Sequence, residues 1–401
     1  MKNLYLTALL SITFFTNVFS QIPTLNGKIV YHTYSGYENW DGEIFILDLS
    51  DNSVTNISSG WNIDHEINAM FSPDGNKIVF MGDIKGDGQR NWDIFLWTIG
   101  GGQPVNLTPY GGRDEDPKFS PDGTKIVYKS DNDILIMDLQ GNLLSNVTNT
   151  PNIEESMPYY TVDGSKILFA PGAGSESDIY SINVNGTNRQ PVVSQSNYQE
   201  YYPITRDNES FFYTGWVNSF NLNDQVFLKY DTSSTSVYLP FNTTNANYSD
   251  ATPAGLQYAI LSSTKNGGKG GYDLYIADIN TGDIWSLDDY NNNVNNAYEN
   301  LGANYLPSGT LSLNKSKKRQ IKVSLYPNPI LQERALNIQI QDSQIQYINF
   351  IQVINMQGQI LKSILLENES HVKIEMNYPK GIYFVKINQG DITHVEKIII
   401  N

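Results

Sequence analysis

The chain has 401 residues, no cysteine and a formal net charge of −16 at pH 7. Without cysteine it can form no disulfide, thiolate nucleophile or cysteine metal site. Its acidity excludes nucleic-acid binding, because contacts with phosphate need clustered lysine and arginine.

Residues 1–20 have the pattern of a secretory signal peptide. Lys2 precedes a mainly apolar run, Leu4–Phe15, and Val18–Ser20 supplies a cleavage site before Gln21. The run is too short to span a membrane, and no other stretch approaches the ~18 apolar residues that a transmembrane helix needs. We therefore expect export from the cytoplasm and no transmembrane segment.

A repeat of 41 to 54 residues organises the next three hundred residues. The turn "FSPDG" occurs at Phe71–Gly75 and again at Phe119–Gly123, and looser copies follow. The equivalent turn positions are Asp74, Asp122, Asp163, Asp207, Ala254 and Ser308. Each period contains four short runs of β-branched and aromatic residues separated by Gly, Asn or Asp, which predicts four antiparallel strands. This period is typical of one propeller blade.

The two ends of the repeat region predict a closed ring. Residues 26–31 match the second strand of a blade, and residues 304–309 match the inner strand and turn that come before such a strand. A ring that joins its ends in this way leaves few exposed strand edges. We therefore expect an all-β fold, a six-bladed β-propeller of four-stranded antiparallel blades, followed by a small C-terminal β-sandwich.

The repeat resembles a known family. The stretch "DPKFSPDGTKIVYKS", at Asp116–Ser130, is followed by "DILIMDLQGN", at Asp133–Asn142, and together they are similar to the TolB-type, or WD40-like, β-propeller repeat. The resemblance covers about residues 27–313 and implies a TolB-like propeller domain over residues 21–314. Propellers of this family bind proteins, glycans or small ligands, so the resemblance implies a fold more than a function.

After a basic linker at residues 315–322, the period ends and alternating strands fill residues 323–401. This module resembles the type A sorting domain of the type IX secretion system of Bacteroidetes. The matching positions are Tyr326, Pro327, Asn328, Pro329, Gly358, Gly381, Tyr383 and Lys397. The resemblance implies recognition by the secretion machinery and a protein that is secreted or attached to the outer cell surface. The alternative is an adhesive sandwich domain.

Two sets of repeated aspartates are expected to be structural. The turn aspartates can bond the backbone of their own turn. A second set stands at or next to the start of the third strand of each blade and is expected to form local hydrogen bonds. Its members are Asp93, Asp133, Asp178, Asp224 and Asp273.

A third set of acids comes just before the inner strands, which line the channel of a propeller. Its members are Glu66, Glu115, Glu155, Glu200, Asp250 and Glu299. They are predicted to ring one mouth of the channel and to bind a cation or a cationic peptide. We expect no cofactor, with a divalent cation in the channel left open, since Ca²⁺ prefers oxygen ligands. The alternative is that these acids cap loops and face solvent.

Aromatic residues in the longer loops are expected near the same mouth. They are Tyr34, Tyr37, Trp40, Trp92, Trp216 and Tyr272. Exposed aromatic rings beside carboxylates suit sugar stacking or protein recognition. The alternative is that they pack between blades.

These observations favour a binding function. No G-x-S-x-G nucleophile motif occurs, so the leading hypothesis is a monomeric, secreted or cell-surface protein that recognises a glycan or an extracellular protein. The alternative is a polysaccharide lyase or glycoside hydrolase that uses the rim carboxylates, because two acids at a suitable separation are sufficient for glycoside hydrolysis.

Overall fold

The computed structural model describes residues 21–84, 91–110, 112–172, 177–194, 199–218, 221–308, 323–330, 334–340, 348–355, 360–365, 371–389 and 392–400. The chain forms two compact units, residues 1–311 and residues 312–401. The predicted signal peptide (1–20) and basic linker (315–322) lie outside the described residues.

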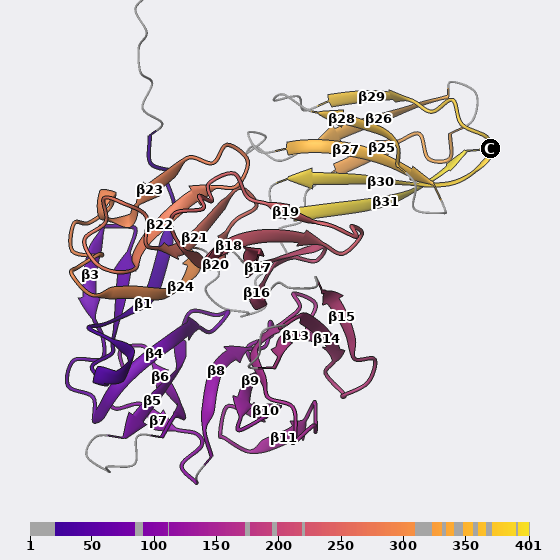
Figure 1. The fold of residues 1–401 in the computed structure, drawn as a ribbon. Coiled ribbons are helices and arrows are strands. Elements are labelled where there is room, and N and C mark those ends of the chain that lie inside the picture. The colour runs from indigo at the N-terminus through magenta and orange to yellow at the C-terminus, as the bar shows by residue number, and fades with distance from the viewer. Residues whose placement is uncertain are drawn as a thin grey trace, which may run out of the picture. The chain divides into compact units, whose positions relative to one another are not determined.

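The first unit is a propeller of six four-stranded antiparallel sheets in the part of the chain that the structure describes (Figure 1). The inner strands are β4 (Ile63–Phe71), β8 (Asp114–Phe119), β12 (Glu155–Tyr160), β16 (Glu200–Asp207), β20 (Tyr248–Ala254) and β24 (Glu299–Pro307). The second strands are β5 (Lys77–Ile84), β9 (Lys125–Ser130), β13 (Lys166–Pro171), β17 (Ser210–Asn218), β21 (Tyr258–Ser263) and β1 (Gly27–Tyr34). The predicted fold is confirmed.

Two more strands complete each blade toward the outside. The third strands are β6 (Asp93–Thr98), β10 (Asp133–Asp138), β14 (Ile179–Asn183), β18 (Asn221–Tyr230), β22 (Asp273–Asp278) and β2 (Glu43–Asp48). The outer strands are β7 (Val105–Asn106), β11 (Leu143–Asn146), β15 (Gln190–Val193), β19 (Ser236–Tyr238), β23 (Ile284–Ser286) and β3 (Ser53–Asn56). Two short 3₁₀ helices, η1 (Tyr37–Asn39) and η2 (Leu287–Asp289), lie in loops.

The ring closes between the two ends of the repeat region. Strand β24 pairs antiparallel with β1, so that Gly27 lies opposite Pro307 and Tyr34 lies opposite Glu299. The last inner strand therefore completes the blade that the first residues begin, as the sequence predicts.

The repeated turns connect inner and second strands. Asp74 Oδ1 accepts hydrogen bonds from Ser72 Oγ at 2.6 Å and from the backbone N of Asn76 at 3.0 Å. Gly75 has a φ of 69°, which glycine adopts without strain. Asp122 accepts the equivalent bonds in the second copy. These aspartates hold the hairpins closed, as expected from their turn chemistry.

Two of the aspartates at the start of the third strands tie those strands to the segment that contains the outer strand. Asp133 accepts hydrogen bonds from Asn146 Nδ2 at 2.8 Å and from the backbone N of Thr150 at 2.6 Å. Asp93 accepts one from Asn106 Nδ2 at 2.7 Å. Local hydrogen bonding is therefore the role of both residues.

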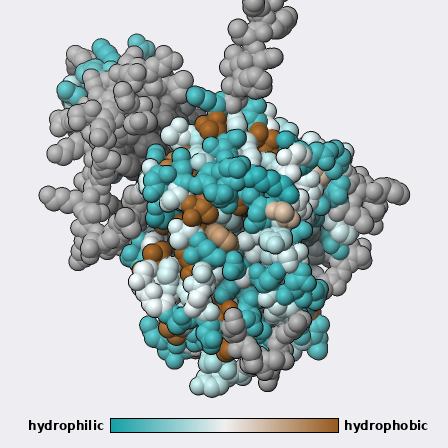
Figure 2. Space-filling model, turned by 90° about the vertical axis from the view of Figure 1, so that its left-hand side faces the viewer, coloured by the Kyte–Doolittle hydropathy of each residue, from teal (hydrophilic) through white to brown (hydrophobic). Residues whose placement is uncertain are grey.

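The propeller core is divided into apolar clusters between neighbouring blades. Val127 and Phe169, from adjacent blades, are both fully buried in one cluster, and Val30 and Phe80 are buried together in another. Removing this apolar surface from water is the main stabilising term in such a fold. On the face that Figure 2 shows, hydrophobic residues of the described part form small patches among hydrophilic ones.

The second unit is built from two sheets that share one core. One sheet has the order β25 (Val323–Tyr326), β26 (Ala335–Ile340), β29 (His371–Glu375), and the other has β28 (Ile360–Leu365), β27 (Ile348–Asn355), β30 (Gly381–Gln389), β31 (Ile392–Ile400). Both sheets contribute to a single apolar cluster that includes Leu336, Ile338, Ile351 and Val385. This is the expected β-sandwich.

Asn328 of the "YPNP" motif binds the last strand. Its Nδ2 donates to the carbonyl of Lys397 at 2.8 Å, and its Oδ1 accepts from the backbone N of Ile399 at 3.1 Å. Tyr383 Oη donates to the carbonyl of Pro379 at 2.8 Å. Gly358 lies outside the described residues.

Candidate ligand-binding site at the channel mouth

Each inner strand contains one residue in the left-handed conformation, close to an irregularity in its pairing with the second strand. These residues are Asn68, Asp116, Met157, Tyr202, Asp250 and Gly302. A bulge of this kind re-aims side chains. These six residues, called here the upper ring, line a small cavity of about 60 Å³ on the propeller axis.

A wider pocket opens above the upper ring. This vestibule has a volume of about 620 Å³ and shares four wall residues with the small cavity: Asn68, Asp116, Met157 and Tyr202. Two cavities with a common wall form one funnel, wide outside and narrow on the axis.

The vestibule lies at the end of the channel opposite the repeated turns. Its wall includes Glu115 and Ser156 from the starts of inner strands and Ala170 from the end of a second strand. The "FSPDG" turns follow the ends of the inner strands, so they lie at the other mouth.

A network of ion pairs fixes one wall of the vestibule. Lys129 Nζ lies 2.8 Å from both Glu115 Oε2 and Glu154 Oε1, and Arg113 Nη2 lies 2.8 Å from Glu115 Oε1. Burial alone would lower the pKa of Lys129, but its hydrogen bonds with the two glutamates outweigh burial and raise it. Lys129 therefore stays positively charged, and its charge balances the carboxylates.

The six predicted rim acids lie at different depths below the protein surface and at different distances from the channel. Glu66, Glu155 and Glu200 come two residues before the upper ring and are 3%, 0% and 1% exposed. They lie below the surface and do not line the vestibule. Glu155 forms an ion pair with Arg189.

The other three acids lie nearer the channel. Glu115 lines the vestibule and Asp250 belongs to the upper ring. Glu299 Oε2 accepts a hydrogen bond from the backbone N of Tyr272 at 2.6 Å. The structure therefore does not gather the six carboxylates into one ring, because they stand at different numbers of residues, from none to three, before the left-handed residue of their own inner strand.

Glu200 is the least compensated of the buried acids. Neither of its carboxylate oxygens has a hydrogen-bond partner among the residues that the structure describes. Burial and, after it, the charge of Asp178 raise the pKa of Glu200 to about 8. The carboxyl group is therefore mainly protonated in the folded protein at neutral pH.

Replacing Glu200 with glutamine should remove a pH-dependent loss of stability. A raised folded-state pKa gives stability that is present at low pH and is lost as the pH rises through about 8. The free energy of unfolding of the variant, relative to that of the wild type, should therefore be about 3 kcal/mol higher at pH 8.5 than at pH 5.5. Chemical denaturation at both pH values measures this gain. Glu209→Gln, at an exposed position, is the control, and an equal gain in both variants would contradict the account.

The predicted aromatic residues form two separate groups. In the first, Trp40 and Trp92 stack with ring centroids 4.9 Å apart, and His65 packs 5.0 Å from Trp92. Trp92 is 2% exposed and packs inside the propeller. Tyr37, which is 39% exposed, lines the vestibule. Tyr34 contacts Tyr37 edge-on at 6.3 Å.

The second group surrounds Asp224. This carboxylate accepts hydrogen bonds from Tyr201, Trp216 and Tyr272. Burial raises the pKa of Asp224, while these donors lower it. Asp224 thus differs from Asp93 and Asp133, because its partners are aromatic side chains.

Tyr201 and Tyr202 are vestibule residues that the sequence analysis did not single out. A signal for this position was present, because a proline follows the upper-ring residue in three blades, at Pro117, Pro158 and Pro203. Aligning the blades on these prolines would have placed Tyr202 beside Asp116.

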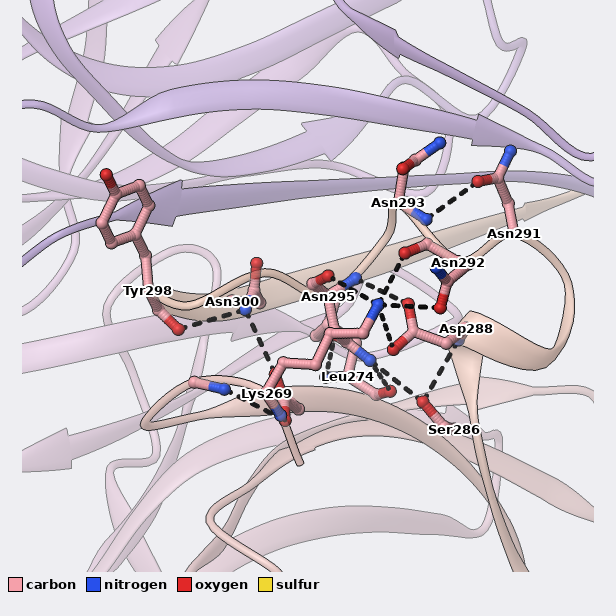
Figure 3. Close-up of polar contacts among 12 residues, drawn as sticks. Lys269, Leu274, Ser286, Asp288, Asn291, Asn292, Asn293, Asn295, Tyr298 and Asn300 are labelled. Carbon is pink, nitrogen blue, oxygen red and sulfur yellow. Dashed lines mark hydrogen bonds and ion pairs between the residues drawn. The ribbon is translucent and has the colours of Figure 1, made fainter. Parts of the chain in front are cut away.

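Lys269 holds the loop that precedes β24, the strand that closes the ring. Lys269 Nζ lies 2.6 Å from the carbonyl of Asn292, 3.0 Å from its Oδ1, 3.3 Å from the carbonyl of Asn295 and 3.1 Å from Asp288 Oδ2 (Figure 3). A Cβ atom at Gly271 would overlap the carboxylate of Glu299. The loop that contains Gly271 therefore fits closely against the start of β24, and this fit keeps Tyr272 beside Glu299.

Residues 324–401 match the family described as the secretion system C-terminal sorting domain. The chain carries a sorting domain of the type IX secretion system. This sorting domain implies interaction with the secretion machinery and a protein that is secreted or attached to the cell surface. The resemblance of the C-terminal module to a type IX sorting domain is confirmed.

Solved structures show a TolB-like propeller fold. TolB from Acinetobacter baumannii is 16% identical, with a TM-score of 0.55 over 71% of this chain and 68% of its own. Hydrazine synthase of Kuenenia stuttgartiensis is 11% identical, with a TM-score of 0.57 over 94% and 67%. A chain of a nidogen–laminin complex is 11% identical, with a TM-score of 0.52 over 70% and 99%. At these identities the likeness concerns the fold alone.

No curated protein sequence matches the chain. Within the described residues, no helix has the length and apolar character needed to cross a membrane, and no group of three or more acidic, histidine or cysteine side chains is placed to hold a metal ion.

Proposed function

We propose that the exported propeller is a binding domain that holds an extracellular glycan or protein in the vestibule. The observation that carries the proposal is a pocket of about 620 Å³ at the channel mouth with tyrosines and fixed ion pairs in its wall. Tyr37, Tyr201 and Tyr202 offer ring surface together with a polar group. The ion pairs around Lys129 form within the protein itself and therefore fix this part of the wall without a contribution from a ligand.

The same geometry gives less support to a lyase or glycosidase. Such enzymes need one carboxylate that is free to protonate the leaving group or to attack. In the vestibule, Glu115 and Glu154 both form ion pairs with Lys129 at 2.8 Å, so neither carboxylate is free for this role. Glu155 and Glu200 are buried away from the pocket.

A ligand screen with vestibule variants tests the proposal. Residues 21–401 are screened by biolayer interferometry against a panel of polysaccharides and against a panel of secreted and cell-surface proteins from the bacterium that produces the protein. Ser156→Trp fills the vestibule and should abolish binding, and Tyr37→Ala should weaken it about ten-fold or more.

Tyr230→Ala is the matched control, because Tyr230 pairs with Ser210 beside the turn at the opposite mouth. It should leave the affinity unchanged. Binding that survives Ser156→Trp, or the appearance of cleaved polysaccharide, would contradict the proposal. Thermal midpoints of all variants exclude misfolding as the cause of lost binding.

A further inference from the structure

The narrow part of the funnel carries an excess of negative charge. Among the residues that line the small cavity, Asp116 and Asp250 are acidic and Lys118 is basic. In the vestibule wall, Arg113 and Lys129 balance Glu115 and Glu154. Among the described residues that line the funnel, one carboxylate is therefore left without a matching cation.

The two carboxylates lie above the lysine. Asp116 and Asp250 both belong to the upper ring, whereas Lys118 follows Asp116 by two residues and lies one level deeper in the channel. Asp116 Oδ1 accepts a hydrogen bond from Asn68 Nδ2 at 2.8 Å, and Asp250 Oδ1 accepts one from Ser249 Oγ at 3.2 Å. A group that enters from the vestibule meets the carboxylates before it meets the lysine.

Lys118 is held loosely for a buried cation. Within the described part of the chain, its Nζ donates one hydrogen bond, to the carbonyl of Pro117 at 3.3 Å. Burial lowers the pKa of Lys118, although Asp116 and Asp250 act to raise it. Burial also raises the pKa of Asp250 to about 7, the direction expected of a carboxylate with too little positive charge nearby.

Tyrosines line this end of the channel: Tyr202 lines both cavities, and Tyr37 and Tyr201 line the vestibule. Burial raises the pKa values of all three, and nearby carboxylates raise them further. All three therefore remain neutral phenols at physiological pH. A phenol ring attracts a cation through its face, so tyrosines and carboxylates together favour a positively charged group.

The shape of the funnel selects a thin group with a charged end. The small cavity of about 60 Å³ has room for a few non-hydrogen atoms, while the vestibule above it is ten times larger. An arginine or lysine side chain has an apolar stem and a charged tip. Its tip fits the upper ring and leaves the backbone that presents it in the vestibule.

Resting on the proposed binding function, we infer that the funnel takes an arginine or lysine side chain of a protein partner, with its cationic end between Asp116 and Asp250. A neutral glycan supplies no such charge. The partner is thus a protein with an exposed basic residue on a protruding segment.

Capped pentapeptides test the inference. Acetylated and amidated Gly-Gly-X-Gly-Gly, with X as Arg, Lys, Gln or Glu, is titrated by calorimetry into residues 21–401. The Arg and Lys peptides should bind at millimolar concentration, and the Gln and Glu peptides should bind about ten-fold more weakly or not at all. Equal binding of the Gln peptide, or no binding of the Arg and Lys peptides, would overturn the inference.

Two variants should act in opposite directions, which a folding defect cannot mimic. Asp250→Asn should weaken binding of the Arg peptide about ten-fold, and Lys118→Met should strengthen it, because it removes the internal competitor. Glu209→Gln, at the opposite mouth, is the control and should have no effect. An unchanged or weaker affinity in Lys118→Met would overturn the inference.

These outcomes separate the inference from the proposed function. If a ligand from the screen is lost in Ser156→Trp but is unaffected by Asp250→Asn and Lys118→Met, the vestibule binds ligands and the inference is wrong. If ligand binding is indifferent to Ser156→Trp, the proposed function itself is wrong.

Discussion

Replacing Arg189 with alanine should lower the free energy of unfolding by about 3–5 kcal/mol. Arg189 forms an ion pair with Glu155, which is 0% exposed, and its guanidinium lies 5.2 Å from the ring centroids of both Phe169 and Tyr180. Removing the arginine leaves a buried carboxylate without its charge partner and also removes packing. Thermal and chemical denaturation of the full chain measure the loss.

Arg113→Ala is the matched control. Arg113 also pairs with a glutamate, at 2.8 Å, but its side chain is 56% exposed, so its loss should cost about 1 kcal/mol or less. In an Arg189→Ala background, Glu155→Gln should recover part of the lost stability, because it removes the unpaired charge. Equal losses in Arg189→Ala and Arg113→Ala would contradict the structural role assigned to Glu155.

Deleting residues 323–401 should abolish export across the outer membrane. The sorting domain has a core of its own and matches the sorting-domain family over residues 324–401. Its recognition is therefore expected to be separable from the propeller. In a bacterium with type IX secretion, the truncated protein should be absent from the cell surface and the medium, as immunoblotting of fractions would show.

A gain-of-function experiment complements the deletion. A reporter that carries a secretory signal peptide and residues 323–401 should reach the surface or the medium, whereas the same reporter with residues 21–308 should not. Surface delivery of the truncated protein would show that export is determined elsewhere in the chain.

The fold was predictable because its signals are local. Asp74 and Gly75 determine a turn by their own chemistry, and the alternating apolar residues of strands such as Lys125–Ser130 define which face is buried. The ring closure followed from matching residues 26–31 with a second strand. None of these inferences requires knowledge of how blades pack together.

The site was less predictable because it depends on register. Spacing in the sequence aligned Glu200 with Asp250, but the bulges place Asp250 on the channel and Glu200 inside the fold. Trp92 lies in the loop before β6, as the sequence suggests, but it packs against Trp40 and His65 and is 2% exposed. A shift of one or two residues in a strand changes which face a side chain occupies, and loop lengths alone do not reveal such shifts.

Lys118 and Tyr202 were missed for a related reason. Each belongs to one blade only, so neither appears as a repeated feature of the sequence. Functional residues of a repeat protein are often those that break the repeat, and they become visible once the six inner strands are superimposed on their left-handed residues.

Hydrogen exchange of the full chain with a ligand from the screen is the most direct test of the central claim, that the exported propeller binds through its vestibule. The account predicts slower exchange at the starts of β8, β12 and β16, around Glu115, Ser156 and Tyr201, and no change at the "FSPDG" turns. Protection confined to those turns or to the sorting domain would contradict it.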